Sequence, residues 1–378
     1  MKTIRWLCVL VALLGSTQSA WAISWRKQNT DLITVNRRLH GQVIDHTANH
    51  GVDRRIWSAA LQQRRDLYVY LPPNFDPNLR YPFVLWFHGF AQDEGSFLRE
   101  VAPRIDAAIA AGALPPMIVA SPDGSVEGEP CHIKPGSFYI NSKAGPFEDY
   151  IMKDVLPFVF AHYPLRPERE AHVIAGLSMG GFGAYTLGIK HRDLFGVVVG
   201  IYPPLNLRWM DEKGEYFAKF DPNSWGWRTQ VTSRREVIAR FYGGLVTFTA
   251  AQVIEPIFGR SEQGLQEVIK HNPIEMLDSY HLKPGELQLY VCYGAKDEFN
   301  MAAQIESFLY AAKQRGIEVG KGYDPQGHHD LETAVRLFPG MVEWMRPRIM
   351  PYAPCRPEDC DWRTPTRPSP AETAPGLD

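Results

Sequence analysis

The chain has 378 residues, of which 45% are apolar and 22% are charged, and its formal net charge is −2. This is the composition of an ordinary globular protein, long enough for one large domain or two smaller ones. The nearly neutral balance gives no reason to expect nucleic acid or an anionic membrane as a partner.

The N-terminus has the layout of a secretion signal. Lys2 and Arg5 supply positive charge, residues 6–14 are apolar, and Ala20-Trp21-Ala22 is a cleavage site of the small-x-small kind. The apolar run is too short to span a bilayer. We therefore expect a signal peptide at residues 1–22, export to a periplasm or beyond, and no stable membrane insertion.

Apolar runs alternate with helical patterns along most of the remaining chain. The predicted strands are Gly41–Asp45, Asp66–Leu71, Tyr81–Phe87, Pro116–Ala120, Ala171–Ala175, Phe195–Ile201, Glu286–Tyr293 and Glu318–Tyr323. The predicted helices are Phe97–Gly112, Phe147–His162, Phe182–Lys190, Met301–Arg315 and a last one that ends at Trp344. Continuous apolar strands are typical of a sheet covered on both faces. This order predicts an α/β fold with a mostly parallel central sheet and helices on both faces.

Two segments interrupt the alternation. Residues from about 203 to 284 show no strand pattern and carry many aromatic side chains, so we expect a helical cap insertion between two sheet strands. Its aromatic residues would form a pocket wall, the core of the insertion, or both. Residues 351–378 hold seven prolines without apolar periodicity, so we expect a disordered tail.

Four cysteines remain after the signal, which is an even number in an oxidising compartment. Cys355 and Cys360 are close enough in sequence to close a small loop. Cys292 lies in an apolar strand and is compatible with a buried thiol. Cys131 falls in a long loop, and no Cys-x-x-Cys zinc pattern is present.

One motif lies at the centre of the predicted sheet. Gly176-Leu177-Ser178-Met179-Gly180 joins a buried strand to a helix, which is the context of a nucleophile elbow. A serine hydroxyl is a poor nucleophile, so it needs a tight turn that presents it beside a base and an oxyanion site. A glycine-rich turn before a helix can also hold a phosphate, but the dinucleotide and P-loop patterns are absent. We therefore interpret Ser178 as the nucleophile.

Candidate partners for Ser178 follow later strands. Asp297 lies just after one predicted strand and His329 just after the last one. The order Ser, Asp, His is that of an α/β-hydrolase triad, and residues after parallel strands gather at one edge of the sheet. His329 would act as the base and Asp297 would orient its imidazole. Three neighbours remain as alternatives: Glu298 and Asp330 for the acid, and His328 for the base.

The same edge offers hydrogen-bond donors for an oxyanion. The N–H of Met179 and that of Phe90, which follows a strand ending in His88-Gly89, would bind it. Losing one such donor typically costs ~3 kcal/mol of transition-state stabilisation. The run His328-His329-Asp330 offers zinc-ligand types, but adjacent residues rarely point at one ion. We therefore expect no metal and no cofactor.

At these motifs the chain resembles the esterase family of the α/β-hydrolase superfamily, which includes esterase D-like enzymes, feruloyl and siderophore esterases, and mycolyltransferases. The matching features are Phe87-His88-Gly89, Phe138–Asn141 with Tyr150 and Asp154, Gly176–Gly181, Tyr293–Asp297, and Gly327–Asp330. The resemblance implies an eight-stranded hydrolase sheet, no metal, a catalytic histidine at His329, and ester cleavage through an acyl-enzyme. The long aromatic insertion and the proline-rich tail depart from the compact members.

Together these features predict an exported serine esterase with residues 23–350 as its catalytic domain. Its substrate would be a small-molecule or carbohydrate-linked carboxylic ester, and the aromatic insertion favours aromatic or lipophilic esters. Two alternatives stay open. One is an acyltransferase in which an alcohol or sugar replaces water at the same triad, and the other is a non-catalytic binding protein on a hydrolase scaffold.

Overall fold

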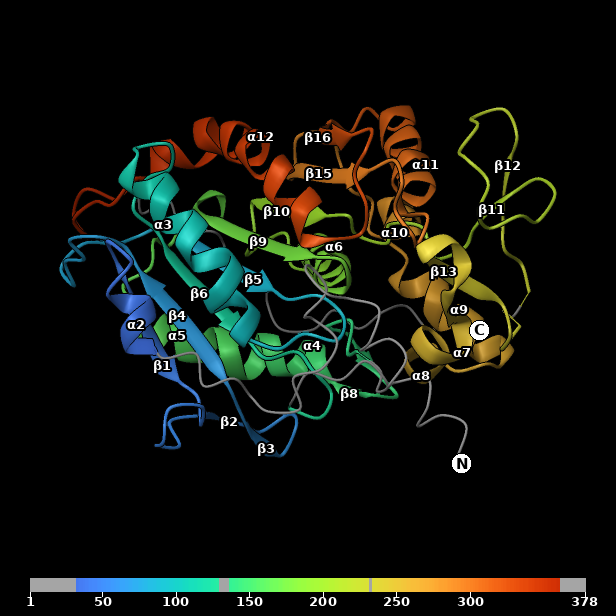
Figure 1. Ribbon diagram of the computed structural model, residues 1–378. Helices are drawn as coiled ribbons and strands as arrows, with labels where there is room; N and C mark the ends of the chain where they lie inside the picture. The colour runs from blue at the N-terminus through green and yellow to red at the C-terminus, as the bar shows by residue number, and fades with distance from the viewer. Residues whose placement is uncertain (1–31, 129–135, 231–232, 361–378) are drawn as a thin grey trace, which may run out of the picture.

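Eight strands form one central sheet in the computed structural model, which describes residues 32–128, 136–230 and 233–360 (Figure 1). Across the sheet they are β1 (Gln42–His46), β4 (Leu67–Leu71), β6 (Ile118–Pro122), β5 (Phe83–Phe87), β9 (His172–Leu177), β10 (Val197–Ile201), β15 (Gln288–Gly294) and β16 (Val319–Asp324). Strand β4 is antiparallel to both β1 and β6, and the other pairs are parallel. The predicted signal peptide and Cys131 lie outside the described residues.

All eight predicted strands are strands of this sheet, and the predicted α/β class is confirmed. Every residue of β5, β6 and β10 is buried, as their continuous apolar runs require. Two short hairpins lie beside the sheet, β2 (Ile56–Ser58) with β3 (Gln63–Arg65) and β7 (Asn141–Ser142) with β8 (Gly145–Pro146). Because six neighbouring strands run parallel, the loops at their carboxyl ends lie along one edge, where chemistry is expected.

Helices cover both faces of the sheet (Figure 1). On one face lie α3 (Ala102–Ala110), which continues the π-helical turn η1 (Phe97–Val101), and α12 (Leu331–Ile349); on the other lie α5 (Leu156–His162), α6 (Met179–Lys190) and α11 (Met301–Gln314). Shorter helices are α2 (Leu32–Asn36), α4 (Phe147–Asp149), η2 (Tyr150–Val155) and η3 (Arg169–Ala171). Within the described ranges, no helix combines the length and apolar character needed to cross a membrane.

The insertion between β10 and β15 differs from the predicted helical cap, because it begins with two β-hairpins. They pair β11 (Trp209–Asp211) with β12 (Trp225–Trp227), and β13 (Val237–Phe241) with β14 (Val246–Thr249) through the turn η4 (Tyr242–Gly244). Four helices follow: α7 (Ala250–Val253), α8 (Glu255–Phe258), α9 (Glu262–His271) and α10 (Pro273–Ser279). The strands are three to five residues long, too short for alternation to be visible in the sequence.

The described chain continues beyond residue 350 to residue 360, where the proline content predicted a disordered tail; the rest of that predicted tail, residues 361–378, lies outside the described residues. The turn η5 (Met350–Tyr352) extends α12, and Cys355 forms an antiparallel bridge with Arg80. Cys355 and Cys360, which the sequence showed to be close enough to close a small loop, form a disulfide, whereas Cys292 is a buried free thiol whose pKa burial raises to about 12. Pairing with Arg80 satisfies backbone groups that proline-rich segments usually leave to water, which is why this stretch is ordered.

Candidate active site

Ser178 lies on a sharp turn between β9 and α6. Its backbone has φ 54° and ψ −117°, a conformation that costs an L-residue about 1–3 kcal/mol and is typical of functional turns. The Ser178 N–H donates to the Ile201 carbonyl at 2.8 Å, which fixes the turn. Two residues before and two residues after Ser178 only glycine fits, because a Cβ on Gly180 would lie 2.3 Å from the Phe87 carbonyl oxygen and one on Gly176 would lie 2.4 Å from Gly180.

The imidazole of His329 connects Ser178 to Asp297. Its Nε2 lies 2.8 Å from Ser178 Oγ, and its Nδ1 lies 2.7 Å from Asp297 Oδ2. Because a carboxylate only accepts hydrogen bonds, Nδ1 carries the proton and Nε2 is the acceptor for the serine hydroxyl. The Asp297 side chain has no exposed surface, and that of His329 is 11% exposed. The structure thus brings together the three residues that the sequence singled out.

Asp297 is held by the start of α11. Its Oδ1 accepts the backbone N–H groups of Phe299 at 2.9 Å and Met301 at 3.3 Å, which leaves Oδ2 for the histidine. Helix N-termini favour a negative charge at this position. The rings of Phe299 and Tyr202 pack against the His329 imidazole, with centroids at 4.8 Å and 4.4 Å. These contacts restrict both the acid and the plane of the base.

The three alternative residues have other partners. Glu298 Oε1 lies 2.7 Å from His328 Nδ1, and Glu298 Oε2 accepts the backbone N–H of His329 at 2.9 Å. Asp330 is the N-cap of α12, where its Oδ1 accepts the Thr333 N–H at 2.8 Å. Sequence reasoning could not separate these neighbours, because the direction of each side chain depends on contacts between three separate loops.

The loop after β5 is fixed by the buried ring of His88. Its Nε2 accepts the Gly124 N–H at 2.9 Å, so Nδ1 carries the proton and donates to the Gly89 carbonyl at 2.9 Å. The Gly89 N–H in turn donates to Gln92 Oε1 at 2.8 Å. Since the Gly89 donor is already used, the next N–H along the loop, that of Phe90, is the candidate for an oxyanion.

Phe90 and Met179, the two predicted oxyanion donors, have side chains that meet beside Gly136. A Cβ on Gly136 would lie 2.2 Å from Met179 Sδ and 2.9 Å from Phe90 Cδ2. Met179 is also the first residue of α6, so its N–H lies at the positive end of that helix. The two loops are therefore neighbours, as a two-donor oxyanion site requires.

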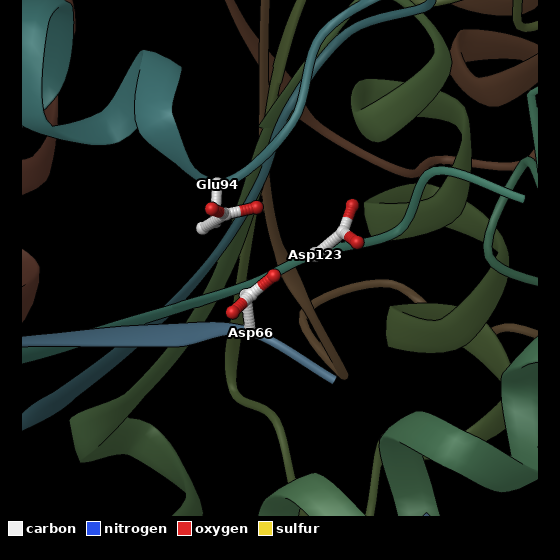
Figure 2. Close-up of side chains that lie close together, drawn as sticks. All are labelled: Asp66, Glu94 and Asp123. Carbon is white, nitrogen blue, oxygen red and sulfur yellow. The ribbon is translucent and has the colours of Figure 1, made fainter. Parts of the chain in front are cut away.

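One group among the described residues has the composition of a metal site. Asp66, Glu94 and Asp123 are buried, and each offers a carboxylate oxygen within 4.8 Å of the others (Figure 2). Burial is the largest influence on the Asp123 pKa and raises it, but the charge of Arg65, whose Nη2 lies 2.8 Å from Asp123 Oδ2, acts together with His88 and Ser125 to lower the pKa to about 2.

Arg65 thus supplies a cation to this group, and we assign no metal to it. Burial and the neighbouring carboxylates raise the pKa of Glu94 well above its ordinary value, which favours its neutral form. This group was not predicted from the sequence, because its three members lie far apart in the chain. The available signal was polar residues at the ends of two strands, Asp66 before β4 and Asp123 after β6.

The order of the eight strands, with a serine elbow after the central strand β9, defines an α/β-hydrolase fold. Within that class the chain belongs to the family described as "Putative esterase", whose family model matches residues 58–332. A curated esterase of Mycobacterium tuberculosis is 24% identical over 323 residues, covering 81% of this chain and 62% of that protein. The chain therefore spans less than two thirds of the length of this relative.

Solved structures show the same fold at low sequence identity. A ferulic acid esterase has a TM-score of 0.59 and 18% identity, with 82% of this chain and 99% of that chain covered. An S-formylglutathione hydrolase from Agrobacterium tumefaciens has a TM-score of 0.56 and 15% identity, with 82% and 96% covered. At such identity these similarities support the sheet and its connections rather than a shared substrate.

Proposed function

We propose that the protein is a serine carboxylesterase that works through an acyl-enzyme. The observation that carries this proposal is the continuous chain of contacts Ser178–His329–Asp297, at 2.8 Å and 2.7 Å. Ser178 Oγ attacks the ester carbonyl carbon while His329 Nε2 takes its proton. The same proton then goes to the departing alcohol, and the acyl group stays on Ser178. Water, deprotonated by His329, releases the acid and restores the serine.

Charge develops at two points in each step. Asp297 stabilises the imidazolium that forms on His329, and the N–H groups of Met179 and Phe90 receive the oxyanion. The contacts of His329 with Ser178 and Asp297 exist without a substrate, which supports a site that needs little reorganisation. Preorganisation of this kind is usually the largest contribution to the rate.

We further propose an aromatic acyl group as the preferred substrate feature. The support is a row of rings that reaches the base: Phe299 packs on His329, and Phe241 and Phe248 of the insertion pack on Phe299 with centroids at 5.6 Å and 6.0 Å. A structural neighbour named as a ferulic acid esterase is consistent with this preference. The alcohol part would be a small molecule or a carbohydrate.

Hydrolysis of a p-nitrophenyl ester panel by the mature chain tests the proposal. The wild type should turn over, whereas Ser178→Ala and His329→Ala should lose about 10⁴-fold or more in kcat. His328→Ala is the matched control and should keep at least about a tenth of kcat. A phosphonate probe should label Ser178 of the wild type and of His328→Ala, but neither Ser178→Ala nor His329→Ala, as read by mass spectrometry of the peptides.

Other outcomes would point to the alternatives. Transfer of the acyl group to an added alcohol in place of water would identify an acyltransferase. Ligand binding without turnover, and without labelling of Ser178, would identify a binding protein.

We also propose that the protein is exported. The support is the signal pattern at residues 1–22 together with the Cys355–Cys360 disulfide, since disulfides persist in oxidising compartments. N-terminal sequencing of the mature protein from a periplasmic or secreted fraction should begin at Ile23. Recovery of the uncleaved chain from the cytoplasm alone would contradict export.

A further inference from the structure

Glu298 follows the acid of the triad directly, and the proposed chemistry gives it no role. Even so, its carboxylate accepts a hydrogen bond from the backbone of the loop that carries the base. We propose that Glu298 is a positioning residue, whose carboxylate fixes the backbone of His329 so that Nε2 meets Ser178 Oγ. This inference rests on the proposed function, because it concerns the same base.

One carboxylate holds two consecutive residues of the histidine loop. Glu298 Oε2 accepts the backbone N–H of His329 at 2.9 Å, and Oε1 lies 2.7 Å from Nδ1 of His328. The Glu298 side chain is only 16% exposed, whereas that of His328 is 45% exposed. Hydrogen bonds to an ionised and largely covered carboxylate are stronger than neutral ones. Because the two hydrogen bonds hold consecutive residues, they restrict the backbone conformation at His328 and His329.

The backbone of Glu298 is itself fixed from the opposite side. Its carbonyl accepts the N–H of Arg240 at 3.0 Å, so the acid loop is hydrogen-bonded to strand β13 of the insertion. The next residue, Phe299, packs on Phe241 of the same strand and on the His329 ring. The backbone of Glu298 is therefore held by the insertion and not by the histidine loop, so its carboxylate can fix the position of His329.

The geometry distinguishes this role from those of its neighbours. Asp297 contacts the ring of His329, and so acts on its proton and charge. Glu298 contacts the main chain of His329, and so determines the position of the imidazole ring. Loss of Glu298 should then leave substrate binding intact and slow the proton transfer, since reacting groups displaced by a fraction of an ångström lose rate.

Kinetics of Glu298→Ala and Glu298→Gln in the mature protein test the inference. Glu298→Ala should lower kcat for p-nitrophenyl acetate, and the rate of phosphonate labelling of Ser178, by about 10- to 100-fold, with KM changed less than about twofold. Glu298→Gln keeps an oxygen acceptor for the His329 N–H, so it should recover kcat to within about fivefold of the wild type. The matched control is Glu332→Ala, since Glu332 is 78% exposed and pairs with Arg336.

Several results would overturn the inference. One is a kcat for Glu298→Ala within about twofold of the wild type, and another is a loss that appears in KM alone. A third is failure of Glu298→Gln to recover activity while Glu298→Ala remains folded. If Glu298→Ala does not fold, Glu298→Asp decides, because the shorter side chain keeps the charge but withdraws the carboxylate from the His329 N–H. That variant should lose about three- to tenfold in kcat, and a value within about twofold of the wild type overturns the inference.

The labelling experiment also separates the two levels of the proposal. If the wild type is not labelled at Ser178, the esterase proposal fails and this inference fails with it. If the wild type is labelled and Glu298→Ala is labelled equally fast, only the positioning role of Glu298 is wrong.

Discussion

The central sheet and the insertion between β10 and β15 are built in different ways. Inner strands of the sheet such as β5, β6 and β10 are buried along their whole length, and the loops that follow the sheet strands hold Ser178, Asp297 and His329. The insertion uses short strands and aromatic contacts, and the tip of its second hairpin leaves Tyr242 and Leu245 exposed by 68% and 89%. We infer from this difference that the sheet holds the residues proposed for catalysis, whereas the insertion shapes the substrate site around them.

The two regions meet at a second place besides Glu298. His271 of α9 directs Nδ1 toward Lys190 of α6, with 3.3 Å between Nδ1 and Nζ, and Lys190 pairs with Glu148 at 2.7 Å. Lysine can only donate, so His271 is an acceptor there and stays neutral. The insertion is thus attached to the sheet domain by hydrogen bonds at both of its sides, and each attachment can be broken separately.

The largest effect is expected at the sheet edge. Asp297→Asn places an amide group where a carboxylate held Nδ1–H, which favours the wrong imidazole tautomer and should lower kcat by about 10⁴-fold. The matched change in the insertion is Asp211→Asn, which affects a turn that accepts from Lys213 and Glu215. Ester hydrolysis assays should show wild-type kcat for that control. An equal loss of kcat in both variants would contradict the idea that the catalytic residues lie in the sheet domain and not in the insertion.

Glycines in the two regions differ in the space around them, and this difference predicts different effects of alanine substitution on stability. Gly180→Ala forces a Cβ against the Phe87 carbonyl and should lower the free energy of unfolding by about 3 kcal/mol. Gly226→Ala in β12 meets its nearest atom, the Asp211 oxygen, only at 3.8 Å and should change it by less than about 1 kcal/mol. Urea unfolding measures both. If the two variants were equally stable, the elbow would not be as tightly packed as described.

The contact of His271 predicts a dependence of stability on pH. Burial, with the charges of Lys190 and Lys270, lowers the pKa of His271 from 6.5 to about 3. Below pH 6.5 His271 is therefore protonated in the unfolded chain but stays neutral in the folded chain. The free energy of unfolding consequently falls as the pH falls from 6.5 toward 3. Between pH 7 and pH 5 this group should cost about 2 kcal/mol.

Replacing the histidine should remove that contribution. Urea unfolding at pH 7 and pH 5 should show a smaller loss for His271→Gln than for the wild type, while the exposed His281→Gln should behave as the wild type. The same loss in His271→Gln as in the wild type would show that another group causes the acid sensitivity.

The smallest effect is expected where the insertion shapes the substrate site. Phe248→Ala removes a ring that packs on Phe299 and should raise KM for an aromatic ester by ~10-fold, with KM for an acetate ester unchanged. Phe220→Ala is the control, because Phe220 packs on Trp209 and Trp225 in the first hairpin. Steady-state kinetics with both esters decide. Equal changes for the two esters would mean that the ring has a general structural role.

The sequence predicted best what depends on local pattern. Buried strands and the Gly176–Gly180 turn can be recognised from short stretches of consecutive residues, and both lie where the sequence predicted them. The insertion hairpins were missed, because three residues such as Trp225–Trp227 carry no visible period. The residue pattern by itself could not separate His328 from His329, although the family resemblance implied His329, since contacts with Asp297 and Glu298 from another loop decide which ring reaches the serine.

The bridge between Cys355 and Arg80 places the last described residues at one end of the sheet. Arg80 lies just before β5, whereas the loop of Phe90 lies just after it, so the two are separated by a five-residue strand of roughly 17 Å. The disulfide ties Cys360 to Cys355 at that same end. A linker or solid support joined directly after Cys360 would therefore be attached at the end of the sheet opposite the serine loop, which would leave the serine edge open to large or immobile esters.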